Sequence, residues 1–140
     1  MPENDVERKR TGEHRLATGE TWHLCAYEHW NEHARSQNYV PEQFARDGFI
    51  HCTNEASRLI EIANHYYRDD PRPYVALKIN LNAVPARAVY EDSANEFPHI
   101  YGDLPVESVI NVLPVERGEC GTFKRLEDLG TSRVLGQQGD

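Results

Sequence analysis

Polar and apolar residues alternate along several short segments of the chain, and this alternation predicts β-strands. The first strand covers residues 21–26, with Trp22, Leu24 and Ala26 on one face and His23 and Cys25 on the other. The same pattern predicts further strands over residues 48–52, 74–81, 87–91 and 109–113. The segment 97–102 is expected to be rigid because Pro98 fixes its backbone, and a turn is expected at 104–108.

Helical spacing of apolar residues occurs in two segments. Residues 27–36 have a composition compatible with a helix, and Asn38 and Pro41 end it. A stronger helix is predicted over residues 56–67, and Thr53 offers the chemistry of a helix cap just before it. Two helices among short strands predict an α+β sheet domain.

The two ends of the chain differ from this middle part. Residues 1–18 are charged and have almost no apolar periodicity, and residues 117–140 are rich in glycine. We therefore expect a flexible N-terminal tail, a domain over residues 19–116 and a flexible C-terminal tail. The sequence has no apolar stretch of the length that a membrane helix or a signal peptide needs, so we expect no membrane partner and a cytoplasmic location.

Composition narrows the classes of partner. The chain has 140 residues and a formal net charge of −8 at pH 7, which suits one domain and makes nucleic acid an unlikely partner. The three cysteines have no C-x-x-C spacing, so we expect reduced thiols rather than a disulfide framework. Nothing in the sequence indicates the oligomeric state.

Histidine is the most informative residue type. Of the 7 histidines, His23, His51 and His99 lie in tight local frames: Trp-His-Leu-Cys, Phe-Ile-His-Cys-Thr and Phe-Pro-His-Ile-Tyr-Gly. Each alone could be a half-buried histidine whose ring nitrogens are satisfied within the core. Three together favour a shared site, which we expect to be a single cleft. His14, His29, His33 and His65 are interpreted as surface or helix residues without a role.

His51 stands just before the predicted helix cap Thr53. Free N–H groups and the positive end of the helix dipole make such a position suitable for an anion. His51 could then contact a phosphate or a ribose hydroxyl. The alternative is that Thr53 only caps the helix.

Histidine and cysteine side chains near these positions could also bind zinc: His23, Cys25, His51, Cys52 and His99. Neighbouring residues of a strand point to opposite faces, so His51 and Cys52 cannot both join one site. The spacing of the set matches no standard zinc signature, and we therefore expect no metal.

Three motifs, in order along the chain, carry a family resemblance: Thr21-Trp22-His23-Leu24-Cys25, Asp47-Gly48-Phe49-Ile50-His51-Cys52-Thr53, and Glu96-Phe97-Pro98-His99-Ile100-Tyr101-Gly102-Asp103-Leu104-Pro105. Together they resemble the bacterial domain-of-unknown-function family 952. That family is grouped with the ADP-ribosyltransferase-like proteins, which include RNA 2′-phosphotransferases. The resemblance implies an ADP-ribosyltransferase-like α+β fold with a small mixed sheet and two main helices.

The resemblance also implies roles for particular residues. His23 is similar to the histidine that bonds the adenosine ribose in such enzymes, and His51 is similar to a second-strand histidine. His99 and Tyr101 belong to the third motif and are expected to line the same cleft. The transferase pattern further includes a late glutamate, for which the candidates are Glu91, Glu96 and Glu107, and the phosphotransferase pattern includes arginines, for which they are Arg15, Arg58 and Arg87.

We therefore expect a transferase that uses NAD or a related phosphorylated nucleotide. Its expected catalytic residues are His23, His51 and His99, and its expected cofactor-binding residues are His23, Thr53 and Tyr101. The alternative is a non-catalytic module that binds a nucleotide or another protein and whose histidines are structural.

Overall fold

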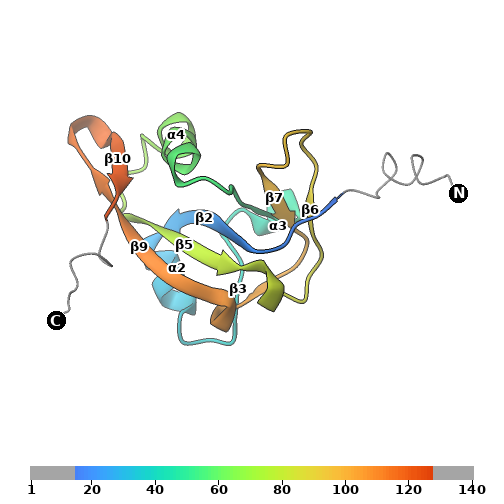
Figure 1. Cartoon of the computed structure of the whole chain (residues 1–140). Helices are drawn as coiled ribbons and strands as arrows, with labels where there is room; N and C mark the ends of the chain where they lie inside the picture. Colours follow the sequence, from blue (N-terminus) through green and yellow to red (C-terminus); the bar gives the residue numbers. More distant parts are fainter. Residues whose placement is uncertain (1–14, 128–140) are drawn as a thin grey trace, which may run out of the picture.

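A computed structural model describes residues 15–127 of the chain as an α+β fold. Its larger sheet has four strands in the order β10 (Phe123–Leu126), β9 (Val109–Arg117), β5 (Tyr74–Asn80) and β2 (Glu20–Ala26). β5 is central in this sheet, because it pairs with β2 on one side and β9 on the other. Figure 1 shows these long strands side by side.

The remaining strands are short and form two smaller groups. One sheet has the order β1 (Arg15–Leu16), β6 (Ala88–Tyr90), β7 (Pro98–Ile100) and β4 (Ile50–His51), and β3 (Asn38–Tyr39) pairs with β8 (Leu104–Pro105). Every strand pairing in the described part is antiparallel. The expected single mixed sheet is therefore replaced by separate antiparallel sheets. β2 and β9 occupy both edges of β5, and at the outer edge of β2 Trp22 forms an isolated bridge with Thr53, so the short strands do not extend this sheet.

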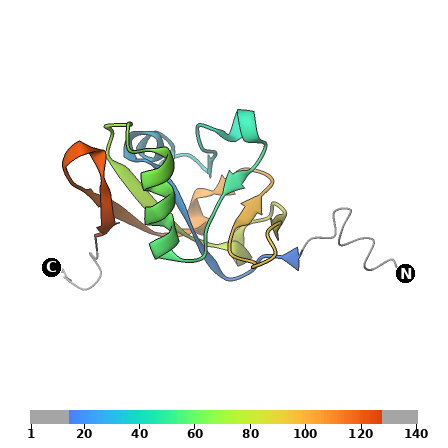
Figure 2. The same cartoon turned by 90° about the horizontal axis from the view of Figure 1, so that it is seen from above.

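The helices are α2 (Tyr27–His33), α3 (Phe44–Asp47) and α4 (Ala56–Tyr66), and single 3₁₀ turns cover Leu81–Ala83, Val106–Ser108 and Glu119–Gly121. α2 and α4 confirm the two predicted helices. α4 lies along one face of the larger sheet, as Figure 2 shows from above. Within residues 15–127 no helix is both long and apolar enough to cross a bilayer.

β2 is covered on both faces, and this places His23 inside. Cys25 belongs to the main hydrophobic core, whereas Leu24 and Ala26 pack in a second cluster with Ala63 of α4. The face with the more polar residues, His23 and Cys25, is therefore more buried than the face with Trp22 and Leu24. Alternation alone predicted the two faces but not that both are covered.

The ordered part extends beyond the domain boundaries expected from the sequence. β1 pairs with β6, and Ala17, expected in the N-terminal tail, is buried. β10 pairs with β9, and Phe123, expected in the C-terminal tail, is only 1% exposed. Gly118 and Gly121 lie in the turn between β9 and β10, and Gly121 has a positive φ of 77°. Residues 1–14 and 128–140 of the expected tails lie outside the described residues.

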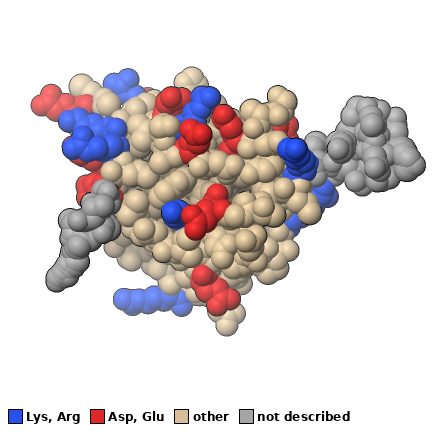
Figure 3. Space-filling model, viewed as in Figure 1, with Lys and Arg blue, Asp and Glu red and all other residues tan. Residues whose placement is uncertain are grey.

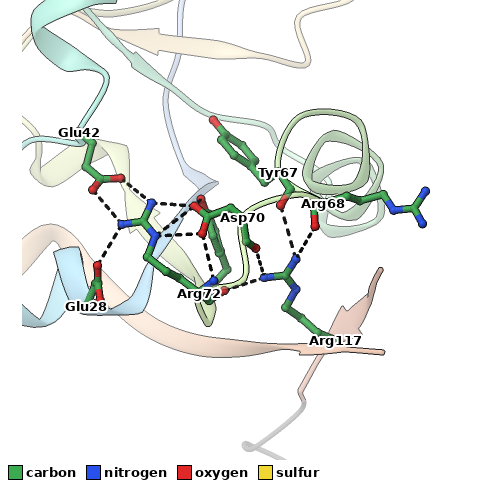
Figure 4. Close-up of polar contacts among 8 residues, drawn as sticks. Glu28, Glu42, Tyr67, Arg68, Asp70, Arg72 and Arg117 are labelled. Atoms are coloured by element: carbon green, nitrogen blue, oxygen red, sulfur yellow. Dashed lines mark hydrogen bonds and ion pairs between the residues drawn. The ribbon is translucent and has the colours of Figure 1, made fainter. Parts of the chain in front are cut away.

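Arg72, just before β5, forms hydrogen bonds with α2 and with the two loops that contain Glu42 and Asp70 (Figure 4). Its guanidinium donates to Glu28 Oε2 at 3.2 Å, Glu42 Oε2 at 3.0 Å and Asp70 Oδ2 at 2.7 Å. The hydrogen bonds from Arg72 hold the pKa of the Asp70 and Glu42 carboxyls below their ordinary values.

Arg117 of β9 fixes the C-terminal end of α4 (Figure 4). It donates to the main-chain oxygens of Asp70 at 2.6 Å, Arg72 at 2.7 Å and Arg68 at 3.3 Å. A cation at this end also interacts favourably with the helix dipole. These bonds set the position of the α4 turn that carries the side chains described below.

Charged side chains of both signs are interspersed over the face of the molecule in Figure 3, among wide uncharged areas. Binding to a nucleic-acid backbone relies on basic side chains that neutralise phosphates. This face therefore has no broad basic area of that kind.

Candidate functional site

His51 and His99 lie directly opposite each other on the antiparallel strands β4 and β7. Their neighbours Ile50 and Ile100 are fully buried, so strand alternation turns both histidine rings to the outer face. The ring centroids are 5.3 Å apart, and the His51 side chain is the more exposed of the two. The structure thus brings together two of the three histidines singled out in the sequence.

Each of these histidines is held by a carboxylate. His51 Nε2 lies 3.0 Å from Asp47 Oδ2, and His99 Nδ1 lies 2.6 Å from Glu91 Oε1. Since an ionised carboxylate only accepts, the imidazole nitrogen donates in both pairs. His51 Nδ1 and His99 Nε2 then keep a lone pair when the rings are neutral, so each ring can accept a proton from a ligand.

Asp47 stays ionised because Arg46 donates to both of its oxygens, through Nε at 2.8 Å and Nη2 at 3.2 Å. These bonds, followed by the hydrogen bond from His51, lower the pKa of Asp47 to about 2. Gly48 ends α3 in the left-handed conformation, with φ of 81°, and turns the chain into β4. This turn explains how Asp47 comes within reach of His51.

Aromatic side chains surround His99. The Phe49 ring stacks on it at 4.1 Å between centroids with 20° between the planes. Tyr101 donates to Glu91 Oε1 at 2.7 Å, and this is the same oxygen that accepts from His99. Partial burial and the bond to Glu91 raise the pKa of Tyr101 to about 12, so its hydroxyl stays protonated at neutral pH.

A cleft of about 490 Å³ opens beside His51, between the α3–β4 segment and α4. Its lining residues are Arg46, Asp47, His51, Cys52, Ile62, Tyr66, Tyr67 and Phe97. The volume lies in the range of small-molecule sites, which is roughly 300–1,000 Å³. Tyr66 is 69% exposed, so α4 presents an aromatic ring to solvent at this cleft.

A smaller cavity of about 60 Å³ shares four lining residues with the cleft: His51, Cys52, Ile62 and Tyr67. Thr53 also lines it, and the Thr53 hydroxyl is buried without a hydrogen-bond partner among the described residues. A buried hydroxyl without a partner is costly, so this cavity suits a water molecule or a hydroxyl group of a ligand.

Thr53 does not cap α4 as the sequence suggested. It stays extended and pairs with Trp22 of β2, whose O accepts from Thr53 N at 2.9 Å. The helix begins at Ala56, and its cap residue, Glu55, makes no side-chain cap bond. Because the Thr53 N–H is already used, the expected anion site next to it does not form in that way.

His23 is a buried histidine with both ring nitrogens bonded, at 4% exposure. Nδ1 donates to the main-chain oxygen of His51 at 2.7 Å, so Nε2, 3.0 Å from Tyr39 Oη, accepts from that hydroxyl. Burial lowers the pKa of His23 to about 4 and keeps the ring neutral. His23 therefore touches the backbone of the His51 strand and not the exposed histidine rings.

The residues weighed as zinc ligands do not gather around one point. Cys25 and Cys52 are buried thiols whose pKa values burial raises, and His23 has no free nitrogen. Within residues 15–127, three potential ligand side chains come close together elsewhere, on α2.

Sequence reasoning left out several contributors to the site. Asp47 and Phe49 were part of a motif, but no role was inferred for either of them, and no role was inferred for Arg46. The four-residue spacing of Asp47 and His51 gave no usable signal, because a glycine turn and not a helix connects them. Glu91 was one of three candidate glutamates, and the structure places it in the site.

Solved structures of another protein share the fold of this chain. The chain is similar to the X-ray crystal structure of protein CC0527 from Caulobacter crescentus, with 18% identity, a TM-score of 0.63, and coverage of 75% of this chain and 93% of that chain. The solution NMR structure of CC0527 gives 19% identity, a TM-score of 0.55, and coverage of 80% and 94%. At these identities the likeness shows a shared fold alone.

No curated protein matches this chain. A family model described as "Protein of unknown function (DUF952)" matches residues 24–112, which include the last two residues of the first motif and all of the other two motifs. Because this match spans more than half of the residues, the chain belongs to the DUF952 family of proteins of unknown function.

Proposed function

We propose that the protein binds a phosphorylated nucleotide, NAD or a related compound, in the cleft beside His51 and transfers a group from it. The observation that carries the proposal is the pair of histidines, His51 and His99. They lie opposite each other on the neighbouring strands β4 and β7, and a carboxylate orients each ring. Two such groups are what a transfer reaction with acid–base catalysis requires.

The proton transfers can be assigned to atoms. His51 Nδ1, with Nε2–H held by Asp47, removes a proton from an attacking hydroxyl. When the bond that breaks is a phosphate ester, His99 in its protonated form donates a proton from Nε2 to the leaving oxygen, while Glu91 accepts from its Nδ1–H. Nicotinamide leaves NAD as a neutral base and needs no proton, so His99 would then only contact the ligand. The two carboxylates orient the rings and stabilise the imidazolium form.

Side chains that line the cleft would bind the nucleotide. Arg46 uses Nε and Nη2 on Asp47, which leaves its Nη1 group to donate to a phosphate oxygen. Tyr66 and Phe97 offer ring faces for a base or nicotinamide ring. The Thr53 hydroxyl in the adjoining cavity would bond a ligand hydroxyl.

The ADP-ribosyltransferase-like grouping is part of this proposal. Supporting it are the antiparallel sheets, the histidine on the first long strand and a glutamate, Glu91, in the site. In this chain we assign His23 a positioning role, because both of its ring nitrogens are bonded within the protein.

A second candidate function is a module that binds the same nucleotide without chemistry. The observation that favours this module concerns Arg46. Among the described residues that line the cleft, Arg46 is the arginine, and it already forms an ion pair with Asp47. A catalytic phosphate clamp more often has arginines free for bidentate bonds.

Calorimetric titration of the full chain with NAD, ADP-ribose and ADP tests binding, and chromatography of the incubated ligand tests turnover. We expect micromolar binding that Tyr66→Ala weakens by at least about tenfold, and turnover that His99→Gln abolishes. Glu61→Gln, a change of an exposed residue of α4 outside the cleft lining, is the control and should change neither. Binding without turnover would favour the module, and no binding of any of the three compounds would refute both functions.

A further inference from the structure

α2 places two histidines and a glutamate on one stretch of its surface. His29 and His33 are four residues apart and therefore lie on the same helix face, with Glu32 beside them. Their ring centroids are 4.5 Å apart. One ligand atom from each of the three side chains lies within 4.8 Å of the others.

We propose that His29, Glu32 and His33 bind a divalent transition-metal ion such as Zn²⁺. Two imidazoles and one carboxylate form a donor set that suits Zn²⁺ and disfavours Mg²⁺ and Ca²⁺, which prefer oxygen ligands. Zinc with bonds of about 2.1 Å needs donor atoms about 3.4 Å apart. The exposed Glu32 side chain can close this remaining distance by rotation.

The second nitrogen of each ring is already engaged in the way that metal-binding histidines require. His29 Nε2 donates to the main-chain oxygen of Val40 at 2.7 Å, and His33 Nδ1 donates to that of His29 at 2.9 Å. A carbonyl oxygen only accepts, so these bonds fix the tautomers and leave one lone pair on each ring. Bonds of this kind to the outer nitrogen are typical of metal-ligating histidines.

Packing further restricts the two rings. Tyr39, which is fully buried, contacts the His29 ring at 5.6 Å and the His33 ring at 5.8 Å between centroids, edge to face in both cases. Arg72, whose guanidinium forms an ion pair with Glu28 of α2, also forms an ion pair with Glu42. Three protein ligands leave a coordination position for water, so we expect an exchangeable ion and not a structural one.

The test is a calorimetric titration of the untagged full chain with ZnCl₂, with Co²⁺ absorption as a readout of coordination geometry. We expect one ion per chain with a micromolar dissociation constant, weakened at least about tenfold by His33→Ala and by Glu32→Gln. The glutamine variant changes an exposed side chain and should fold normally.

His51→Ala and His65→Ala serve as controls, because they remove histidines outside α2. Full zinc affinity in both supports the proposed site. Loss of zinc binding in His51→Ala, unchanged binding in His33→Ala and Glu32→Gln, or no binding to the wild-type chain would each overturn it.

Discussion

His23 and His51 are joined by a hydrogen bond of 2.7 Å, yet they lie in opposite environments. His23 is 4% exposed, and both of its ring nitrogens are bonded to groups of the protein. The His51 side chain is 59% exposed, and its ring has one nitrogen on Asp47 and the other available.

The difference shows that burial and the number of bonded nitrogens determine what a histidine can do, even when sequence motifs suggest equal roles. A neutral ring with both nitrogens bonded can hold neighbouring segments in place but cannot exchange a proton without breaking a bond. His23 joins β2 to β4 and to Tyr39, whereas His51 stands where a ligand can reach it.

The largest effect expected from this comparison is on stability in His23→Ala. The change leaves a cavity and removes the partners of Tyr39 Oη and the His51 main-chain oxygen, which should lower the free energy of unfolding by about 3 kcal/mol. Urea unfolding followed by circular dichroism measures it. A loss below about 1 kcal/mol would mean that His23 does not join the two strands as described.

The pH dependence of stability should also reveal His23. Its pKa is about 4 in the folded chain, below the ordinary value of 6.5. Between these values the unfolded chain takes up a proton that the folded chain does not, so the free energy of unfolding falls as the pH falls through this window. The full loss should be about 3 kcal/mol.

His23→Asn is the control for this pH effect. Its side-chain amide can still donate to the His51 main-chain oxygen, but it does not titrate. Urea unfolding between pH 7 and pH 4 should therefore show a flatter profile in the variant. An equally steep profile would assign the effect to other groups.

A smaller effect on the free energy of unfolding is expected for Thr53→Val, which changes a buried side chain two residues after His51. The Thr53 hydroxyl has no partner among the described residues, so a methyl group in its place should raise the free energy of unfolding by about 1 kcal/mol. Thermal unfolding measures this. A decrease would show that the hydroxyl bonds a water molecule in the 60 Å³ cavity, and weaker nucleotide binding would place a ligand there.

The elements with a clear period were predictable from the sequence. Alternation predicted β2 and β5, and helical spacing predicted α4, because side chains repeat every 2 residues along a strand and every 3.6 residues along a helix. β10 was missed, since glycines around it suggested a tail, while the burial of Phe123 depends on the distant α4 and β9.

The candidate site was predictable only in part. His51 and His99 were identified because they lie in local motifs, but their pairing depends on the register of β4 with β7, which no local pattern contains. Asp47 and Glu91 reach them through a glycine turn and a strand end. The hydrogen bonds that engage both ring nitrogens of His23, to Tyr39 and to a main-chain oxygen, likewise depend on tertiary contacts.

The smallest effect on stability, and the sharpest test of the comparison, is expected in His51→Ala. Its ring is largely exposed and has Asp47 as its hydrogen-bond partner, so the free energy of unfolding should change by less than about 0.5 kcal/mol. Nucleotide binding in the cleft, measured by calorimetry, should nevertheless be lost. Glu61→Gln, also a change of an exposed side chain, should retain both stability and binding. If His51→Ala instead lowers stability as much as His23→Ala and leaves binding unchanged, then His51 is a structural residue like its neighbour, and the site loses its proposed base.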